Sequence, residues 1–326
     1  MNILVTGGAG YIGSHTVSEL IKTGHNVFVY DNLSYGHEDK VDRKARFIKG
    51  DITDKESLAN SLKTHKIDSV VHFAAFTYVG ESVKDPSKYY SNNLAGGINL
   101  LNCMKESNVK KIVFSSSCAI FGQPKKVPIT EDEKKEPLSP YGKSKLFFES
   151  MLEDYDKAYG IKSVCLRYFN AAGASLDSSN GEMHDPETHL VPLAIKAALD
   201  SDFSLTVFGD DYPTNDGTCI RDYIHILDLA DAHIKALDYL SKKNQSNQFN
   251  LGSEKGHSIM EIIKKIEELG NVKVKFKIGE RREGDPAMLI ADSTKIKKTL
   301  GWNPKHSDLE TIIKTALAWH VKEYSK

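Results

Sequence analysis

The chain has 326 residues, of which 40% are hydrophobic and 27% are charged, and its formal net charge is −1. That length accommodates one large α/β domain with a smaller appended lobe. The charge balance provides no basic surface for nucleic acid or an anionic membrane, and no apolar run is long enough to span a bilayer. The first residues already resemble a strand, so we expect no signal or transit peptide. The four cysteines lack CxxC spacing and predict a reducing cytoplasm.

The N-terminal half alternates predicted strands and helices. A helix from residue 14 ends at Gly24, and the Thr53/Glu56 pair has the spacing of a capping box that begins another helix. Strands are expected at residues 3–6, 27–31, 69–74, 112–116 and 163–168, and further helical regions at about 86–107 and 140–159. Because parallel neighbouring strands need crossover connections, this alternation predicts a doubly wound parallel sheet, the Rossmann architecture.

After residue 168 the pattern is less regular. Residues 174–188 form a polar loop with glycine and proline, and helices are expected around 190–199, 229–240, 259–269 and 309–324. We therefore expect a second, smaller α/β lobe that binds the substrate. The predicted cofactor domain comprises residues 1–170 and roughly 222–250, and the predicted substrate lobe comprises 171–221 and 251–326.

A glycine-rich turn links the first strand directly to the first helix. Gly7, Gly10 and Gly13 allow a tight turn, close approach of a pyrophosphate and close helix–strand packing. The helix N-terminus then presents free N–H groups and a positive dipole end to the phosphates. Asp31 ends the second strand, where a carboxylate accepts hydrogen bonds from a ribose 2′-hydroxyl and repels a 2′-phosphate. The arrangement predicts NAD as the cofactor in preference to NADP.

Tyr141 and Lys145 lie four residues apart in the helix predicted for residues 140–159, so they share one face. An ammonium about 4 Å from a phenolate contributes on the order of 4 kcal/mol at an effective dielectric near 20, which is roughly three pKa units. That shift would make Tyr141 a general base. The spacing alone is weak evidence, because Tyr239 and Lys243 share it. What distinguishes Tyr141 is the serine segment 115–117 at a strand end, where ligands of this fold bind.

These motifs resemble the extended short-chain dehydrogenase/reductase family and, within it, the UDP-glucose 4-epimerases, from near residue 1 to about residue 305. The segments that carry the resemblance are LVTGGAGYIGSH (4–15), VGES (79–82), YYSNN (89–93), SPYGKSK (139–145), RYFN (167–170), FGDDYPT (208–214), DGTCIRDYIH (216–225) and RREGD (281–285).

The resemblance implies an isomerase that interconverts UDP-glucose and UDP-galactose. Tyr141 would remove the C4 hydroxyl proton with Ser117 bridging, while tightly bound NAD oxidises C4 and then re-reduces the 4-keto sugar on its other face. Lys145 would complete the catalytic set. The NAD contacts implied besides the glycines, Asp31 and the catalytic residues are Tyr11, Ile12, Asn32, Asp51, Ile52, Phe73, Ala74, Asn92 and Phe169. A homodimer is also implied.

For the substrate, the resemblance assigns the pyrophosphate to Arg221 and Arg282, because a guanidinium forks onto phosphate oxygens. It assigns the ribose to Asp285 and the uracil region to Phe208. Met288 would border the hexose and restrict the enzyme mainly to sugars without an N-acetyl group. The further substrate contacts implied are Asn170, His189, Leu190 and Tyr223, together with Ser117 and Tyr141.

Two positions depart from the family pattern: Thr77 stands where a lysine is frequent, and His189 where asparagine is frequent. Residues 184–189 contain two histidines, but the proline break and irregular spacing define no ligand geometry, so no metal is expected. One alternative function is that of another NAD-dependent sugar-nucleotide epimerase, of the UDP-N-acetylglucosamine type. Three further alternatives also stay open. These are a 4,6-dehydratase, which residues 115–121 disfavour because they contain no carboxylate, a net-oxidising dehydrogenase, and a non-catalytic NAD sensor.

Overall fold

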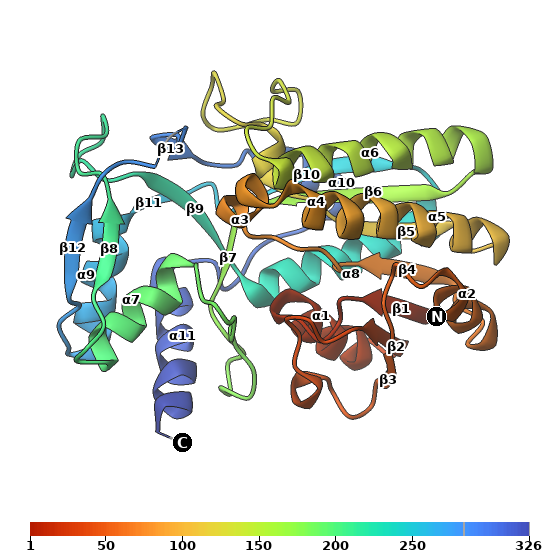
Figure 1. Cartoon of the computed structure of the whole chain (residues 1–326), viewed down its shortest axis with the longest axis horizontal. Helices are drawn as coiled ribbons and strands as arrows, with labels where there is room; N and C mark the ends of the chain where they lie inside the picture. Colours follow the sequence, from red (N-terminus) through yellow and green to blue (C-terminus); the bar gives the residue numbers. More distant parts are fainter. Residues whose placement is uncertain (283, 326) are drawn as a thin grey trace.

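The computed structural model describes residues 1–282 and 284–325 and contains a seven-stranded parallel sheet in the order β10-β6-β5-β4-β1-β2-β3 (Figure 1). The strands are β1 (Asn2–Thr6), β2 (Asn26–Asp31), β3 (Arg46–Lys49), β4 (Ser69–His72), β5 (Lys111–Ser115), β6 (Lys162–Tyr168) and β10 (Asn247–Leu251). The strand order reverses between β1 and β4, which creates a crevice beyond their carboxyl ends. The predicted doubly wound sheet is confirmed.

Helices cover both faces of this sheet because the side chains of its strands alternate. In β1, Ile3 and Val5 belong to the apolar core under α1 and α8, whereas Leu4 belongs to the core under α2, α5 and α6. The helices are α1 (Tyr11–Lys22), α2 (Lys55–Thr64), α5 (Gly97–Glu106), α6 (Pro140–Tyr159) and α8 (Ile226–Lys243). A sheet with both faces buried explains why the middle residues of its central strands β1, β4 and β5 are apolar.

The helix boundaries include one correction. The Thr53/Glu56 capping box is wrong: Asp54 is the N-cap of α2, and its side chain accepts a hydrogen bond from the backbone N–H of Ser57 at 3.0 Å. Asp and Thr are both good N-caps, so the two adjacent candidates could not be separated by residue type. The predicted helix 140–159 agrees with α6, which Ser139 caps at its start and Gly160, at φ 67°, at its end.

The helical region predicted at about residues 86–107 is built from three helical pieces. α4 (Pro86–Tyr89) is followed by a seven-residue π-helix, η2 (Tyr90–Gly96), and then by α5. The short helix α3 (Val79–Lys84) precedes them, and the 3-10 turns η1 (Glu38–Lys40) and η3 (Cys118–Ile120) connect other elements. A π-helical turn is frequently found at a functional site.

The remaining elements form a second layer beside the carboxyl ends of the large sheet (Figure 1). β9 (Ile220–His225) pairs with β7 (Asn170–Ala172), β11 (Gly256–Ser258) and β13 (Met288–Leu289), and β8 (Leu205–Phe208) pairs with β12 (Phe276–Gly279). α7 (Leu190–Leu199), α9 (Ile259–Gly270) and α11 (Leu309–Tyr324) pack together around a third apolar core.

One segment departs from the predicted division of the chain. α10 (Thr294–Leu300) packs on β10, and Ile296 and Trp302 belong to the same core as Ile3 of β1. Residues 294–302 therefore pack with the large sheet, although the sequence placed them in the substrate lobe. Within the described residues, no helix has both the length and the apolar character needed to cross a membrane.

Candidate active site

A cavity of about 1480 Å³ lies between the carboxyl ends of the large sheet and the second layer. It brings together every site residue predicted from the sequence except Asp51 and Met288. The predicted residues that line it are Gly7, Gly10, Tyr11, Ile12, Gly13, Asp31, Asn32, Ile52, Phe73, Ala74, Asn92, Ser117, Tyr141, Lys145, Phe169, Asn170, His189, Leu190, Phe208, Arg221, Tyr223, Arg282 and Asp285.

The turn between β1 and α1 packs so closely that it requires glycine at two positions. Gly7 has φ +74°, and a Cβ there would lie 2.5 Å from the backbone nitrogen of Ala74, which follows β4. At Gly13, a Cβ would lie 2.2 Å from the carbonyl oxygen of Gly7. Gly10 is the N-cap of α1 and provides no side-chain cap, so the first N–H groups of the helix remain available to an anion. These features fit the pyrophosphate of a dinucleotide.

Asp31 braces this turn. Its Oδ2 accepts a hydrogen bond from the backbone N–H of Ala9 at 3.0 Å, and its Oδ1 accepts one from Leu33 at 2.8 Å. Burial raises the pKa of the Asp31 carboxyl, and the two backbone donors oppose that rise. Asp51 does not line the cavity, but its Oδ2 accepts a hydrogen bond from Asn32 Nδ2 at 2.8 Å. Asp51 therefore contacts Asn32, which lines the cavity, and does not line the cavity itself.

Tyr141, Lys145 and Ser117 meet where β5 ends beside α6. Tyr141 and Lys145 are buried, and Lys145 Nζ lies 5.8 Å from the centre of the Tyr141 ring. The same Nζ donates a hydrogen bond to the carbonyl oxygen of Ser115 at 2.7 Å. Ser117 caps the short turn after β5 by accepting a hydrogen bond from the Ala119 backbone at 3.1 Å. The Lys145 amine thus contacts both the end of β5 and the face of the Tyr141 ring.

Burial controls the acid–base properties of this group. It raises the pKa of Tyr141 well above its ordinary value; Tyr168 adds to the rise, and a hydrogen bond from Ser117 opposes it. Burial also lowers the pKa of Lys145 to about 7, against the opposing effect of Glu149. Burial is the largest influence on the pKa of both groups, so the lowering of the Tyr141 pKa by Lys145 stays a prediction from the sequence.

A buried ion pair holds α6 against the sheet. Arg167 Nη2 lies 2.6 Å from Glu149 Oε2, and Glu149 Oε1 also accepts a hydrogen bond from the Ser116 hydroxyl at 2.5 Å. Glu149 is one turn after Lys145, so the pair fixes the helix face that presents Lys145 and Tyr141. The sequence motif contained Arg167, but nothing in it identified Glu149 as the partner.

At the other end of the cavity, the predicted phosphate and ribose residues contact each other. Arg221 Nη2 lies 2.5 Å from Asp285 Oδ1. The Arg282 guanidinium lies 4.1 Å from the centre of the Phe208 ring. Two cations, one carboxylate and an aromatic ring are thus gathered from β8, β9 and the segment before β13. Glu283 of the RREGD segment lies outside the described residues.

The predicted hexose neighbour, Met288, begins the short strand β13. Met288 does not line the cavity as described, whereas Leu289 does. Side chains alternate along a strand, so adjacent residues of β13 point to opposite sides. In the register of β13 with β9, Met288 pairs with Ile220, and Leu289 pairs with Arg221, which also lines the cavity.

Two contributors were missed by the sequence analysis. The Asn93 side chain, in η2, accepts a hydrogen bond from the Phe76 N–H at 2.9 Å and donates one to the Ser144 hydroxyl at 3.1 Å. It therefore fixes the loop after β4 to α6. Lys84 of α3 also lines the cavity.

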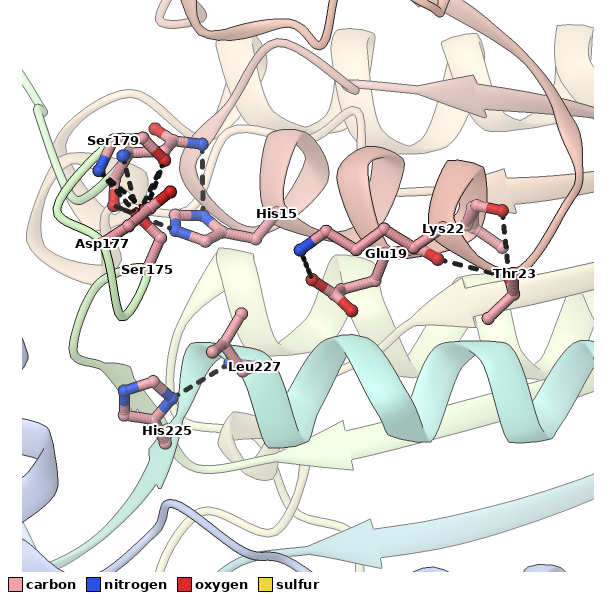
Figure 2. A network of polar contacts seen from close by, with 11 residues as sticks. His15, Glu19, Lys22, Thr23, Ser175, Asp177, Ser179, His225 and Leu227 are labelled. Atoms are coloured by element: carbon pink, nitrogen blue, oxygen red, sulfur yellow. Dashed lines mark hydrogen bonds and ion pairs between the residues drawn. The ribbon is translucent and has the colours of Figure 1, made fainter.

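The loop between β7 and α7 closes one side of the cavity and is anchored to α1. His15 Nε2 lies 3.2 Å from the carbonyl oxygen of Asn180, whose side chain donates to the Ser14 hydroxyl at 2.8 Å. Figure 2 shows His15 facing the turn that carries Ser175 and Ser179. Further along this loop, burial would lower the pKa of His189, but nearby carboxylates raise it to about 10.

Comparisons with known proteins agree with this arrangement. Residues 3–252 match the NAD dependent epimerase/dehydratase family. The chain is 52% identical over 320 residues to a UDP-glucose 4-epimerase of Lactobacillus helveticus, covering 98% of this chain and 97% of the relative. It resembles the UDP-glucose 4-epimerase of Brucella ovis in complex with NAD, with TM-score 0.95, 48% identity and 97% of both chains covered.

A second solved structure, the UDP-glucose 4-epimerase of Bifidobacterium longum in complex with NAD⁺ and UDP, has TM-score 0.95 and 38% identity, with 99% of both chains covered. Sequence identity and structural similarity extend over nearly the whole chain, and the family match covers residues 3–252. The chain therefore belongs to the NAD-dependent epimerase/dehydratase family, and among its members to the UDP-glucose 4-epimerases.

Proposed function

We propose that this chain interconverts UDP-glucose and UDP-galactose by transient oxidation at C4 of the hexose, with NAD retained in the site. The observation that carries the proposal is the meeting of Tyr141, Ser117 and Lys145 with the glycine-rich turn in one cavity. When bound, NAD supplies the oxidation and re-reduction at C4 and a positive ring charge that favours a phenolate. Two ligands share the site, in keeping with a cavity larger than the roughly 300–1,000 Å³ of a single ligand pocket.

The residues of the chain move and hold the proton. Tyr141 accepts the proton of the C4 hydroxyl, and Ser117 bridges the two oxygens, since its hydroxyl both donates and accepts. Lys145 positions the phenol through the Ser115 carbonyl and the face of the ring. When the 4-keto sugar is reduced again, Tyr141 returns the proton, so the enzyme ends the cycle in its starting protonation state.

The nucleotide is gripped at the far end of the cavity, which leaves the hexose free to turn over. Arg221 and Arg282 neutralise the pyrophosphate, and Phe208 supports the uracil. Asp285 holds the ribose and keeps Arg221 oriented through their ion pair. His189 and Leu190 begin α7 at the edge of the same cavity and complete its wall.

The direct test is incubation of the purified protein with UDP-galactose and no added NAD. We expect UDP-glucose as the product, and about one nicotinamide nucleotide per chain released on denaturation. Stoichiometric release of NADH during turnover would identify a net dehydrogenase instead, and a 4-keto-6-deoxy sugar would identify a dehydratase. Protein that turns over only with excess free NAD would contradict retention of the cofactor.

We further infer a homodimer in a reducing cytoplasm. Ile98 of α5 and Phe147 of α6 are exposed, at 41% and 50%, on two helices that pack side by side on the large sheet (Figure 1). Exposed apolar side chains on adjacent helices suit an interface between two copies related by two-fold symmetry. All four cysteines are free thiols, as a reducing compartment would keep them.

A further inference from the structure

Four side chains in the loop between β7 and α7 form a compact cluster of metal-ligand type. They are Glu182, His184, Glu187 and His189, and one ligand atom from each lies within 4.8 Å of the others. The sequence analysis expected no metal because Pro186 interrupts the segment and the spacing is irregular. The four residues lie in an irregular loop, so the loop's fold brings their side chains together although their spacing matches neither a helix nor a strand.

The distances between these atoms suit a single small cation. His184 Nδ1 lies 3.1 Å from Glu182 Oε1 and 3.8 Å from Glu187 Oε2. His189 Nδ1 lies 2.7 Å from Glu182 Oε1 and 3.1 Å from Glu187 Oε1. A tetrahedral zinc ion with nitrogen and oxygen ligands at about 2.0–2.1 Å requires ligand–ligand separations of about 3.3 Å. The four distances lie on both sides of that value.

The two carboxylates of the cluster are shielded from solvent. Glu182 is buried, at 4% exposure, and Glu187 is largely shielded. Among residues 1–282 and 284–325, the only basic groups within ion-pair distance of these two carboxylates are the imidazoles of His184 and His189. When a metal ion binds, each imidazole must release the proton that it shares with these carboxylates, and a divalent ion then neutralises the net charge of −2 on the four groups.

We propose that this cluster binds one zinc ion in a closed, structural site. Four protein ligands leave no open position, so the ion would take no part in the reaction. The site would fix the loop against the phosphate-binding turn, because the His184 ring contacts the ring of Tyr11 edge-on at 6.2 Å. The same loop is held on its other side by Trp319 Nε1, which donates to the Glu182 carbonyl at 3.1 Å.

The test is metal binding by the whole protein after treatment with a chelator. Zinc chloride is added, free ion is removed by desalting, and bound zinc is measured by mass spectrometry. We expect about one zinc ion per chain, and at least about tenfold weaker binding in His184→Gln and in Glu187→Gln. His257→Gln is the matched control, because His257 also faces a glutamate, Glu261, at 3.8 Å but outside the cluster. That control should bind zinc like the wild type.

A second measurement does not depend on the folding of the variants. Cobalt(II) added to the chelated wild type should give the intense visible absorption of a tetrahedral site, and zinc should displace it. The proposal is overturned if the wild type retains no zinc, if both variants bind zinc as the wild type does, or if cobalt shows only the pale spectrum of six-coordinate ions. In those cases the four groups are simply imidazole–carboxylate pairs.

Discussion

The Tyr141 phenol and the Lys145 amine share one buried pocket, and burial shifts their pKa values in opposite directions. Both shifts favour the neutral forms, so the phenolate that accepts the C4 hydroxyl proton needs a nearby positive charge, which the ring of bound NAD would supply. The positive charge of bound NAD would then favour transfer of the C4 hydroxyl proton to Tyr141.

Replacement of Tyr141 tests its role as the acid–base group. Tyr141→Phe removes only the hydroxyl, and we expect kcat to fall by at least about 10²-fold with UDP binding little changed. Steady-state kinetics and calorimetric titration with UDP measure the two effects. Tyr239→Phe is the matched control, because Tyr239 has the same spacing to Lys243 in α8, and it should keep wild-type turnover. Near-normal kcat in Tyr141→Phe would contradict the assignment.

The residue that limits the width of the sugar is expected at Leu289, because Leu289 lines the cavity and Met288 does not. Leu289→Tyr adds bulk at the wall, so we expect kcat/KM for UDP-N-acetylglucosamine to fall relative to UDP-glucose by about 10–200-fold. Met288→Ser should leave that ratio unchanged. If Met288→Ser changes the ratio and Leu289→Tyr does not, the assignment from cavity lining is wrong.

At the scale of elements, α6 connects the catalytic groups to the outer surface. Its inner face presents Tyr141, Lys145 and Glu149, whereas Phe147 points to solvent. The helix continues the amphipathic pattern of a core-facing helix, except that the aromatic side chains of Phe147 and of its last residue, Tyr159, are exposed. An interface at that face would support the helix that positions the active site.

The proposed dimer is tested by placing charge on this face. Phe147→Glu should dissociate the dimer, because a carboxylate buried in an apolar interface loses its hydration without gaining a partner. Size-exclusion chromatography with light scattering gives the mass directly. Val321→Glu, on α11, replaces another exposed apolar side chain and should stay dimeric. A monomeric wild type, or a dimeric Phe147→Glu, would contradict the proposed interface.

At the scale of the whole molecule, Lys145 couples stability to pH. Its pKa is about 7 in the folded chain, whereas the ordinary pKa of an exposed lysine is 10.5. Between these values the unfolded chain binds more protons than the folded chain, so the free energy of unfolding should rise with pH across this window. The slope contributed by one such group reaches about 1.4 kcal/mol per pH unit.

Urea unfolding at several pH values between about 7 and 10 measures this contribution. In Lys145→Met the free energy of unfolding should rise less with pH than in the wild type, because the contribution of Lys145 is lost. Plots of this free energy against pH should therefore differ in slope between the two proteins. Lys243→Met, a change at an exposed lysine, should run parallel to the wild type. Parallel curves for Lys145→Met would show that Lys145 is not desolvated as the structure places it.

The sequence alone determined the elements with strong local signals. Continuous apolar strands, the helix 140–159 between Ser139 and Gly160, and the glycine turn before α1 each depend on neighbouring residues, so their position could be predicted from the pattern. The same motifs predicted most of the residues that line the cavity, because parallel strands bring their carboxyl ends to one edge.

Only the tertiary structure decided the contacts between segments far apart in the chain. The partner of Arg167, the ion pair between Arg221 and Asp285, and the return of residues 294–302 to the large sheet depend on how the layers pack, and no local pattern encodes them. The register of β13 similarly decided that Leu289, and not Met288, faces the cavity. The pKa values of Tyr141 and Lys145 followed from burial, which is a property of the folded chain as a whole.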